Sequence, residues 1–212
     1  MYQPKAHEET DLQVMQDLIQ AFPFGCVVTT NEHGLSANHI PFLIDTHRGN
    51  HGTLRGHIAR ANPLSTMIAA TTEAPIIFQG PDAYISPTWY PSKHETGKAV
   101  PTWNYVAVHA HGLITIKDDP VWVRQMVSDL TDLQEGTQKL PWKLSDAPEE
   151  YIDKMMTAIV GIEIPITRLE GKWKVSQNRT EADRLGVAAG LQSRNTESTR
   201  AIAELVLKSM QG

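Results

Sequence analysis

Short extended segments separated by turn sequences fill much of the chain, and this alternation limits the folds that it can adopt. Apolar and β-branched residues gather in runs such as "FGCVVTT", "GTLRGHIA" and "APIIFQG", with glycine, proline or asparagine between the runs. After the first run, "NEHG" places Gly34 for a tight turn and predicts a hairpin. We therefore expect a mainly β fold in which antiparallel strands form a barrel or a sandwich.

Two further turns are predicted between later strand-like segments. Gly80 and Pro81 separate "APIIFQG" from "AYISPTWY", and Gly171 interrupts "IVGIEIPITRLEGKWKVSQ". Glycine and proline are strong local signals for a change of chain direction. Each position therefore predicts the end of one strand and the start of another.

Helical patterns are predicted at the start of the chain and after the strand-rich region. Residues 12–19 carry an apolar stripe, Thr10 and Gln13 have the spacing of a capping box, and Pro23 ends the pattern. Amphipathic segments at about 118–156 and 180–210 predict peripheral helices. No composition break indicates a linker, so we expect residues 1–212 to form a single domain.

Composition and charge exclude several classes of protein. The 212 residues are 41% hydrophobic and 20% charged, which is typical of a globular chain with a buried core. The formal net charge of -5 and the lack of any lysine or arginine run give no electrostatic basis for nucleic-acid binding. Cys26 is the only cysteine, and no segment resembles a signal peptide or a membrane span. We expect a cytoplasmic protein with no internal disulfide and no membrane partner.

The sequence lacks the common signatures of phosphate, zinc and acyl-transfer sites. It has no Walker loop, no GxGxxG, no CxxC and no GxSxG. His109 and His111 share one face of the predicted strand "VPTWNYVAVHAHG", but no third metal ligand is paired with them in a recognisable motif. We expect these histidines to make hydrogen bonds at a ligand site or an interface, and we expect no metal.

Two segments combine polar and aromatic residues in a way that suits a ligand. "GHIARANP" sets His57 and Arg60 at the end of a predicted strand, before a turn fixed by Asn62 and Pro63. An arginine at such a turn can bind a phosphate through two N–H groups, and a solvent-facing arginine is the alternative. "FQGPDAYISPTWY" carries four aromatic residues that suit stacking on a flat heterocycle or a subunit interface.

Six segments spread over nearly the whole chain resemble one known family. They are "MYQPKAH", "NHIPFLID", "GHIARANP", "IIFQGPDAYISPTWY", "VPTWNYVAVHAHG" and "KVSQNRTEADRLGVAAGL". These segments are similar to motifs of the PaiB-type FMN-binding regulators, a family named from repressors of protease synthesis and sporulation. The resemblance implies an FMN-binding split β-barrel like that of the pyridoxamine phosphate oxidases, with FMN at the interface of a homodimer.

The same resemblance implies which residues contact FMN. "GHIARANP" resembles the segment that meets the flavin phosphate, which puts Arg60 on the phosphate with His57 beside it. "SANHIPF" resembles the strand that runs along the isoalloxazine ring, and "KVSQNR" resembles a late strand contributed by the partner subunit. The implied set is Asn38, His39, Ile40, His57, Arg60, Gln79, Trp103, Asn104, Lys174, Gln177 and Asn178.

The resemblance implies a regulatory flavoprotein, and other functions stay open beside it. A bound flavin also transfers hydride or electrons in FMN-dependent oxidoreductases of the flavin reductase type. Related split barrels include heme-binding and heme-degrading proteins, and a ligand-binding dimer without chemistry is a further alternative. DNA is a partner that the family name implies, but neither the acidic charge nor a helix-turn-helix pattern supports it.

Overall fold

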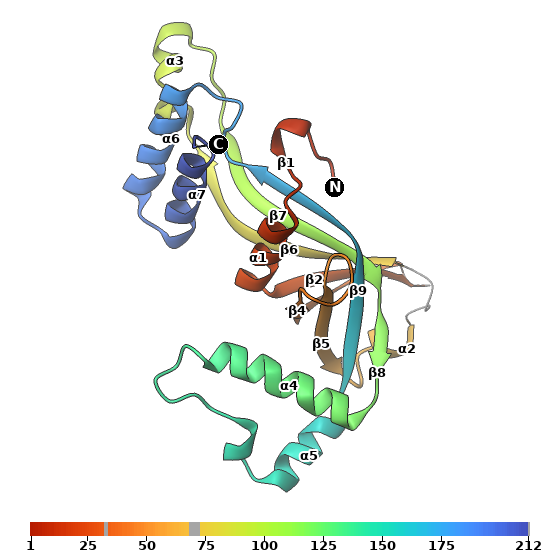
Figure 1. Cartoon of the computed structure of the whole chain (residues 1–212). Coiled ribbons are helices and arrows are strands. Elements are labelled where there is room, and N and C mark those ends of the chain that lie inside the picture. The colour runs from red at the N-terminus through yellow and green to blue at the C-terminus, as the bar shows by residue number, and fades with distance from the viewer. Residues whose placement is uncertain (32–33, 68–72, 212) are drawn as a thin grey trace. The chain divides into compact units, whose positions relative to one another are not determined.

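The computed structural model describes residues 1–31, 34–67 and 73–211. Its strands are β1 (Glu8–Glu9), β2 (Phe24–Asn31), β3 (Gly34–Pro41), β4 (Leu43–Asp45), β5 (Thr53–Ala59), β6 (Glu73–Ile85), β7 (Thr102–Leu113), β8 (Thr115–Lys117) and β9 (Ile159–Lys174). Its α-helices are α1 (Leu12–Ala21), α2 (Leu64–Met67), α3 (Pro91–Thr96), α4 (Pro120–Glu135), α5 (Glu149–Thr157), α6 (Glu181–Arg194) and α7 (Glu197–Lys208). Short 3-10 helices are η1 (Lys5–His7), η2 (Pro87–Trp89) and η3 (Leu144–Asp146) (Figure 1).

The strands form a mostly antiparallel sheet in the order β3-β2-β6-β7-β9-β5-β4, with β1 and β8 also paired to β9. β5 and β9 pair antiparallel from Thr53 opposite Pro165 to Ala59 opposite Ile159. β2 and β3 form the hairpin predicted around Gly34, which lies opposite Asn31 and has a φ of 109°. The prediction of antiparallel strands with peripheral helices is confirmed, and residues 32 and 33 of the turn lie outside the described residues.

Two of the predicted turns are wrong, because the strands run through them without interruption. β6 continues past Gly80 and Pro81, and the ladder between β2 and β6 pairs only Ile76 and Ile77 of β6. Proline is tolerated within a strand where its missing N–H is not needed by a neighbour, and on the β2 side Pro81 lies beyond the paired residues. β9 likewise passes through Gly171, which pairs with Glu9 of β1.

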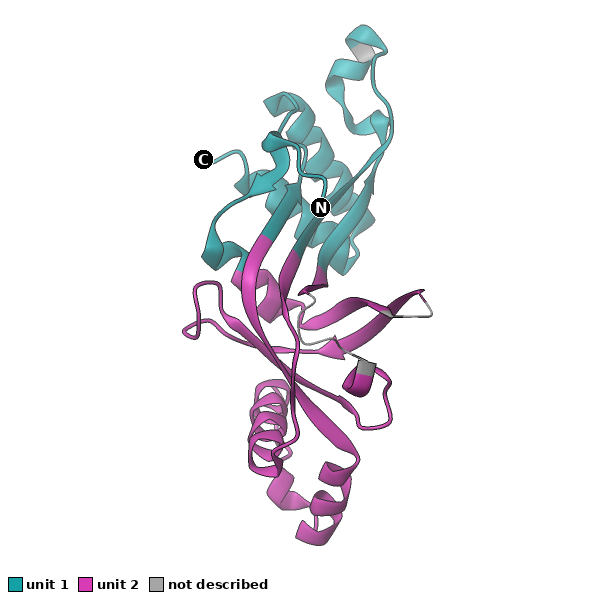
Figure 2. Cartoon of the chain, turned by 90° about the vertical axis from the view of Figure 1, so that its right-hand side faces the viewer, with its two compact units in different colours: residues 1–15, 79–108, 170–212 teal, residues 16–78, 109–169 magenta. Residues whose placement is uncertain are grey.

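The chain forms two compact units, which Figure 2 colours separately. Unit 1 contains residues 1–15, 79–108 and 170–212, and unit 2 contains residues 16–78 and 109–169. The single domain expected over residues 1–212 stays a prediction. Among the described residues, no helix combines the length and the apolar character that crossing a membrane requires.

Unit 2 buries aliphatic and aromatic side chains from its strands and places α4 and α5 at one end of them (Figure 1). Ile76, Phe78, Ile162 and Ile164 are fully buried, and the Phe78 ring meets the Phe42 ring edge-on at 6.0 Å. α4 begins at Pro120, its N-cap Asp119 accepts a hydrogen bond from the Val121 N–H, and it packs against β5. These contacts fix the segment around Asp118 beside the end of β5.

Unit 1 has its own core, formed where α6 and α7 pack side by side (Figure 1). Val187 and Leu191 of α6 and Ile202 and Val206 of α7 are fully buried, and η2 and α3 contact α6. Thr180 and Thr196 cap the two helices with their side-chain oxygens. α1, which begins in unit 1, is capped by Asp11 instead of the predicted Thr10, because the Asp11 carboxylate accepts from the backbone of Gln13 and Val14.

Candidate functional site

Arg60 lies directly after β5 on a turn, as the sequence predicts. The Asn62 N–H donates to the Ala59 carbonyl, and the Asn62 side-chain oxygen accepts from the Leu64 N–H at 2.9 Å. The backbone N–H of Arg60 donates to the Ala158 carbonyl at 2.8 Å, which holds the turn against the start of β9. The turn therefore presents the Arg60 side chain at a defined place in unit 2.

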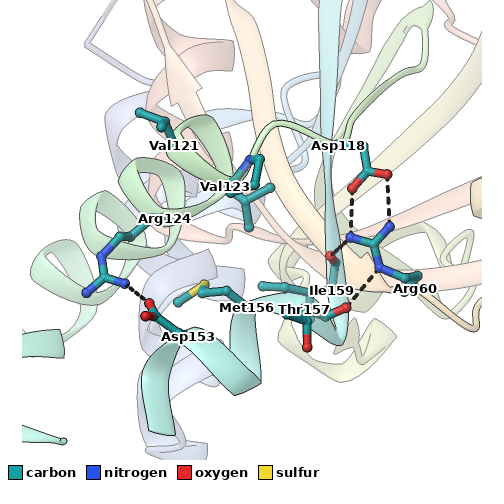
Figure 3. A pocket seen from close by; sticks show the side chains of 10 residues that line it. Arg60, Asp118, Val121, Val123, Arg124, Asp153, Met156, Thr157 and Ile159 are labelled. Atoms are coloured by element: carbon teal, nitrogen blue, oxygen red, sulfur yellow. Dashed lines mark hydrogen bonds and ion pairs between the residues drawn. The ribbon is translucent and has the colours of Figure 1, made fainter. Parts of the chain in front are cut away.

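The guanidinium of Arg60 forms a forked ion pair with Asp118 (Figure 3). Its Nη1 and Nη2 donate to the two carboxylate oxygens at 2.9 and 2.7 Å, and Nε and Nη2 also donate to the carbonyls of Thr157 and Ile159. The hydrogen bond to Asp118 raises the pKa of Arg60, and the same bond lowers the pKa of Asp118. Both side chains are largely exposed, at 46% and 61%, so water screens the pair and competes for its partners.

A cavity of about 490 Å³ opens beside this ion pair, between α4, α5 and the start of β9. Figure 3 shows Val123, Met156 and Ile159 between two ion pairs, Arg60 with Asp118 and Arg124 with Asp153. The volume of this cavity lies within the range of about 300–1,000 Å³ that is usual for small-molecule sites. The lining is mostly apolar, with charged groups at its edges.

His57 faces a different environment from Arg60, although both follow from one predicted motif. It lies within β5 opposite Gly161, and its buried Nδ1 has no hydrogen-bond partner among the described residues. Burial lowers the pKa of His57, so the ring is neutral at pH 7. His57 is not one of the residues that line the Arg60 cavity, and it brings no positive charge to the turn.

β3 places the next three predicted residues in different settings. Asn38 is joined to the Arg60 turn, because its side-chain oxygen accepts from the Asn62 Nδ2 at 2.9 Å. His39 is exposed and stacks on the Phe24 ring, with 5.9 Å between centroids. Ile40 is 3% exposed, so only its backbone could contact a ligand.

In unit 1, Gln79 and Trp103 lie on strands and contact neighbouring side chains. The Gln79 Nε2 donates to Asp82 at 3.2 Å on the surface. Trp103 is 54% exposed and meets the Tyr84 ring edge-on at 6.1 Å. Both residues are accessible for a ligand or for another chain.

A second, smaller cavity in unit 1 brings together three further predicted residues, Asn104, Lys174 and Asn178. Its volume is about 140 Å³. The Lys174 ammonium donates to the Thr102 hydroxyl at 2.5 Å and to the Trp103 carbonyl at 2.7 Å. Asn104 is buried and bonded to the Ser176 hydroxyl at 2.9 Å. Thr102 and Asn104 belong to β7, Lys174 is the last residue of β9, and Ser176 and Asn178 follow it.

Gln177, the last predicted residue, holds the loop after β9 instead of lining this cavity. Its Oε1 accepts from the Val175 N–H at 2.8 Å and bonds the His7 Nδ1 at 3.1 Å, while its Nε2 donates to the Trp173 carbonyl. All three bonds connect elements of unit 1. Both polar atoms of the Gln177 side chain are therefore bonded within unit 1.

Sequence reasoning missed three residues of these sites: Asp118, Tyr90 and Arg179. Asp118 precedes a helix, where an acidic residue is typical of a cap, but its neighbour Asp119 is the cap and Asp118 pairs with Arg60. Tyr90 and Arg179 both line the smaller cavity, and the Arg179 guanidinium lies 4.8 Å from the centre of the Tyr90 ring. Tyr90 is one of the four aromatic residues of "FQGPDAYISPTWY" and Arg179 stands inside "KVSQNRTEAD", so each motif offered a signal without marking the residue itself.

Comparison with known proteins identifies the family. Residues 1–168 match the family model described as "Putative FMN-binding domain". An uncharacterised protein of Aspergillus fumigatus is 36% identical over 97% of this chain and 96% of its own length. The Protease synthase and sporulation protein PAI 2 of Bacillus subtilis is 32% identical over the same shares of the two chains.

Solved structures agree on the fold. The FAD and heme binding protein from Mycobacterium smegmatis has a TM-score of 0.59 and 15% identity, over 79% of this chain and 73% of its own. The flavocytochrome Anf3 from Azotobacter vinelandii has a TM-score of 0.56 and 13% identity, over 84% and 74%. These neighbours share the flavin-binding split-barrel fold that the sequence predicts. The chain therefore belongs to the PaiB-type family of FMN-binding proteins, and its cofactor is a flavin, FMN being the form that fits the family.

Proposed function

We propose that this chain is a flavin-binding regulatory protein that acts as an FMN-loaded homodimer. The observation that carries the proposal is the likeness to PAI 2 of Bacillus subtilis, which extends over 97% of this chain and 96% of that protein. The likeness to PAI 2 therefore also extends beyond residue 168, where the match to the family model ends. When bound, FMN supplies a ring that accepts and donates electrons, which suits either sensing or catalysis.

We infer that Arg60 binds the FMN phosphate by exchanging one anion for another. Its guanidinium already holds a carboxylate in the forked geometry that a phosphate also accepts. Because the pair with Asp118 is exposed, a phosphate can replace the carboxylate without uncovering a buried charge. Asn38 is bonded to Asn62 of the same turn, and we expect it to contact the isoalloxazine ring, as the family resemblance implies. Lys174, Gln177 and Asn178 would belong to the second subunit's share of the contact.

A titration of cofactor-free protein with FMN, followed by quenching of flavin fluorescence, tests this assignment. Arg60→Ala should weaken FMN binding by roughly tenfold or more, since it removes a charge-assisted contact. Asp118→Asn should strengthen binding, because it removes the carboxylate that competes for Arg60. Arg200→Ala, which changes an exposed arginine on α7, is the control and should bind FMN like the parent.

Four results would each overturn one part of the proposal. Unchanged FMN affinity of Arg60→Ala would remove Arg60 from the site. A monomeric mass of the FMN-loaded protein in light scattering would remove the homodimer. If the loaded protein oxidised NADH or NADPH in repeated turnover, an oxidoreductase would replace the regulatory function, and a heme absorption spectrum of the purified protein would favour the heme-binding alternative.

A further inference from the structure

The smaller cavity of unit 1 has the size of an anionic group. Its volume of about 140 Å³ corresponds to only about four or five water molecules in the liquid, which is too little for an isoalloxazine ring. A phosphate or a carboxylate group fits such a volume. Polar side chains make up much of the lining, among them His7, Asn104 and Ser176.

The lining carries two cations, Lys174 and Arg179, and no acidic residue. The Arg179 guanidinium lies over the Tyr90 ring, and no carboxylate in the described chain forms an ion pair with it. Asp183 is the nearby acid, and its two oxygens are already bonded to the backbone and the hydroxyl of Ser92. The charge of the cavity is therefore positive, and Asp183 offsets it only in part.

Two groups at the cavity are incompletely satisfied, because the buried Tyr90 lacks a hydrogen-bond partner of good geometry and Lys174 lacks a carboxylate counter-charge. The hydroxyl of Tyr90, a residue that is 1% exposed, has no hydrogen bond of good geometry among the described residues, and its polar neighbours are Arg179 and Ser176 of the same cavity. Burial lowers the pKa of Lys174, and the nearby charge of Lys172 lowers it further, whereas Tyr105 raises it. No carboxylate is among the groups that act on this ammonium. An anion in the cavity would supply the missing charge and hydrogen-bond acceptors.

We propose that this cavity binds the phosphate or carboxylate group of a small molecule between Lys174 and Arg179. This inference rests in part on the proposed function, which gives Lys174 and Asn178 to the flavin contact, and it adds Arg179 and Tyr90 to form an anion site separate from Arg60. Two of the three N–H groups of the Lys174 ammonium donate to Thr102 and Trp103, and the third is available to donate to the anion. Arg179 contributes a planar guanidinium that no ion pair with a described residue occupies.

The test is a calorimetric titration of the cofactor-free protein with inorganic phosphate in a phosphate-free buffer. We expect saturable binding at one site per chain. Arg179→Gln and Lys174→Met should each weaken phosphate binding by about tenfold or more, whereas Arg179→Lys should keep more of the affinity than Arg179→Gln. Lys98→Met and Arg200→Gln are the controls, because both residues are exposed and lie outside the cavity.

Thermal unfolding of each variant separates loss of binding from loss of the fold. Lys174→Met also removes two hydrogen bonds within unit 1, so Arg179→Gln decides the result if that variant is unfolded. Absence of phosphate binding by the cofactor-free parent, or equal binding by Arg179→Gln and the parent, would overturn the proposal. Loss of phosphate binding in Arg60→Ala would do the same, because the measured site would then be at Arg60.

A second series identifies the source of the anionic group. If saturating FMN prevents phosphate binding and riboflavin does not, this cavity holds the phosphate of FMN in place of Arg60. If the FMN-loaded protein still binds phosphate as the cofactor-free protein does, the cavity serves a separate anionic molecule. Because the first titration uses no flavin, a failure of FMN binding leaves its outcome unaffected.

Discussion

Glu163 shows how single side chains set the pH range in which unit 2 is stable. It is 4% exposed on β9, and its carboxylate meets Arg48 at 2.5 Å and Lys117 at 2.9 Å. Burial alone would raise the pKa of Glu163, but the hydrogen bonds from Arg48 and Lys117 outweigh it and lower that pKa below 4.5. Its contribution to stability is therefore complete above pH 4.5 and is lost as the pH falls through the folded-state pKa.

We predict that Glu163→Gln lowers the free energy of unfolding at pH 7 by about 1–3 kcal/mol, because two cations lose their shared carboxylate. The loss should shrink as the pH falls below 4.5, since the parent then loses the same charge. Urea unfolding at pH 7 and pH 4 measures both values. A difference between the two proteins that stays constant over this range would contradict the role given to Glu163.

At the scale of residues, local sequence predicts the Arg60 turn but not its ion pair. Asn62 and Pro63 are sufficient to indicate a turn, and the turn is where it was expected. Asp118 lies 58 residues further along the chain, directly after β8, and the pairing of β8 with β9 together with the packing of α4 against β5 brings it to Arg60. The neutral state of His57 likewise depends on burial that no local pattern reveals.

At the scale of elements, α6 is held against η2 by a contact that leaves no room for a side chain. A Cβ added at Gly190 would lie 2.3 Å from the Trp89 ring, which is a rigid group. We predict that Gly190→Ala lowers the free energy of unfolding by about 1–3 kcal/mol through overpacking. At an exposed helix position, a change from glycine to alanine raises the free energy of unfolding by about 0.8–1.0 kcal/mol. The sign of the measured change therefore tells whether Gly190 contacts Trp89.

Thermal and urea unfolding of Gly190→Ala measure this effect. Gln192→Ala, at an exposed position of the same helix, should change the free energy of unfolding by less than about 0.5 kcal/mol. A stabilised Gly190→Ala variant would mean that α6 and Trp89 are not in contact in solution.

Element types were predicted well, and strand ends were predicted poorly. The hairpin at Gly34 and the helices within 118–156 and 180–210 agree with the structure, because turn residues and apolar periodicity act locally. The turns predicted at Gly80, Pro81 and Gly171 are absent, because whether the missing N–H of a proline or the missing side chain of a glycine interrupts a strand depends on the neighbouring strands. That information belongs to the assembled sheet.

At the scale of the whole molecule, charge argues against direct recognition of DNA. The chain has 19 basic and 24 acidic residues. Ion pairs with carboxylates already engage the basic side chains of Arg48, Arg55, Arg60, Lys117 and Arg124. Neutralised side chains release few counterions from a DNA backbone, which is the main source of affinity for such binding.

We predict that the isolated protein binds duplex DNA only weakly at physiological salt, with or without FMN. Fluorescence anisotropy with a duplex from upstream of its own gene, and with a random duplex of equal length, measures this. Nanomolar binding to the first duplex that survives competitor DNA would contradict the prediction and make regulation direct. Weak and equal binding to both would place the regulatory action on a protein or a small molecule.

β6, β7 and β9 each contribute residues to both units, so the sequence alternates repeatedly between them. A gene fragment that ended at any unit boundary inside one of these strands would encode a truncated strand. Neither unit is therefore a transferable cassette that recombination could move into another protein.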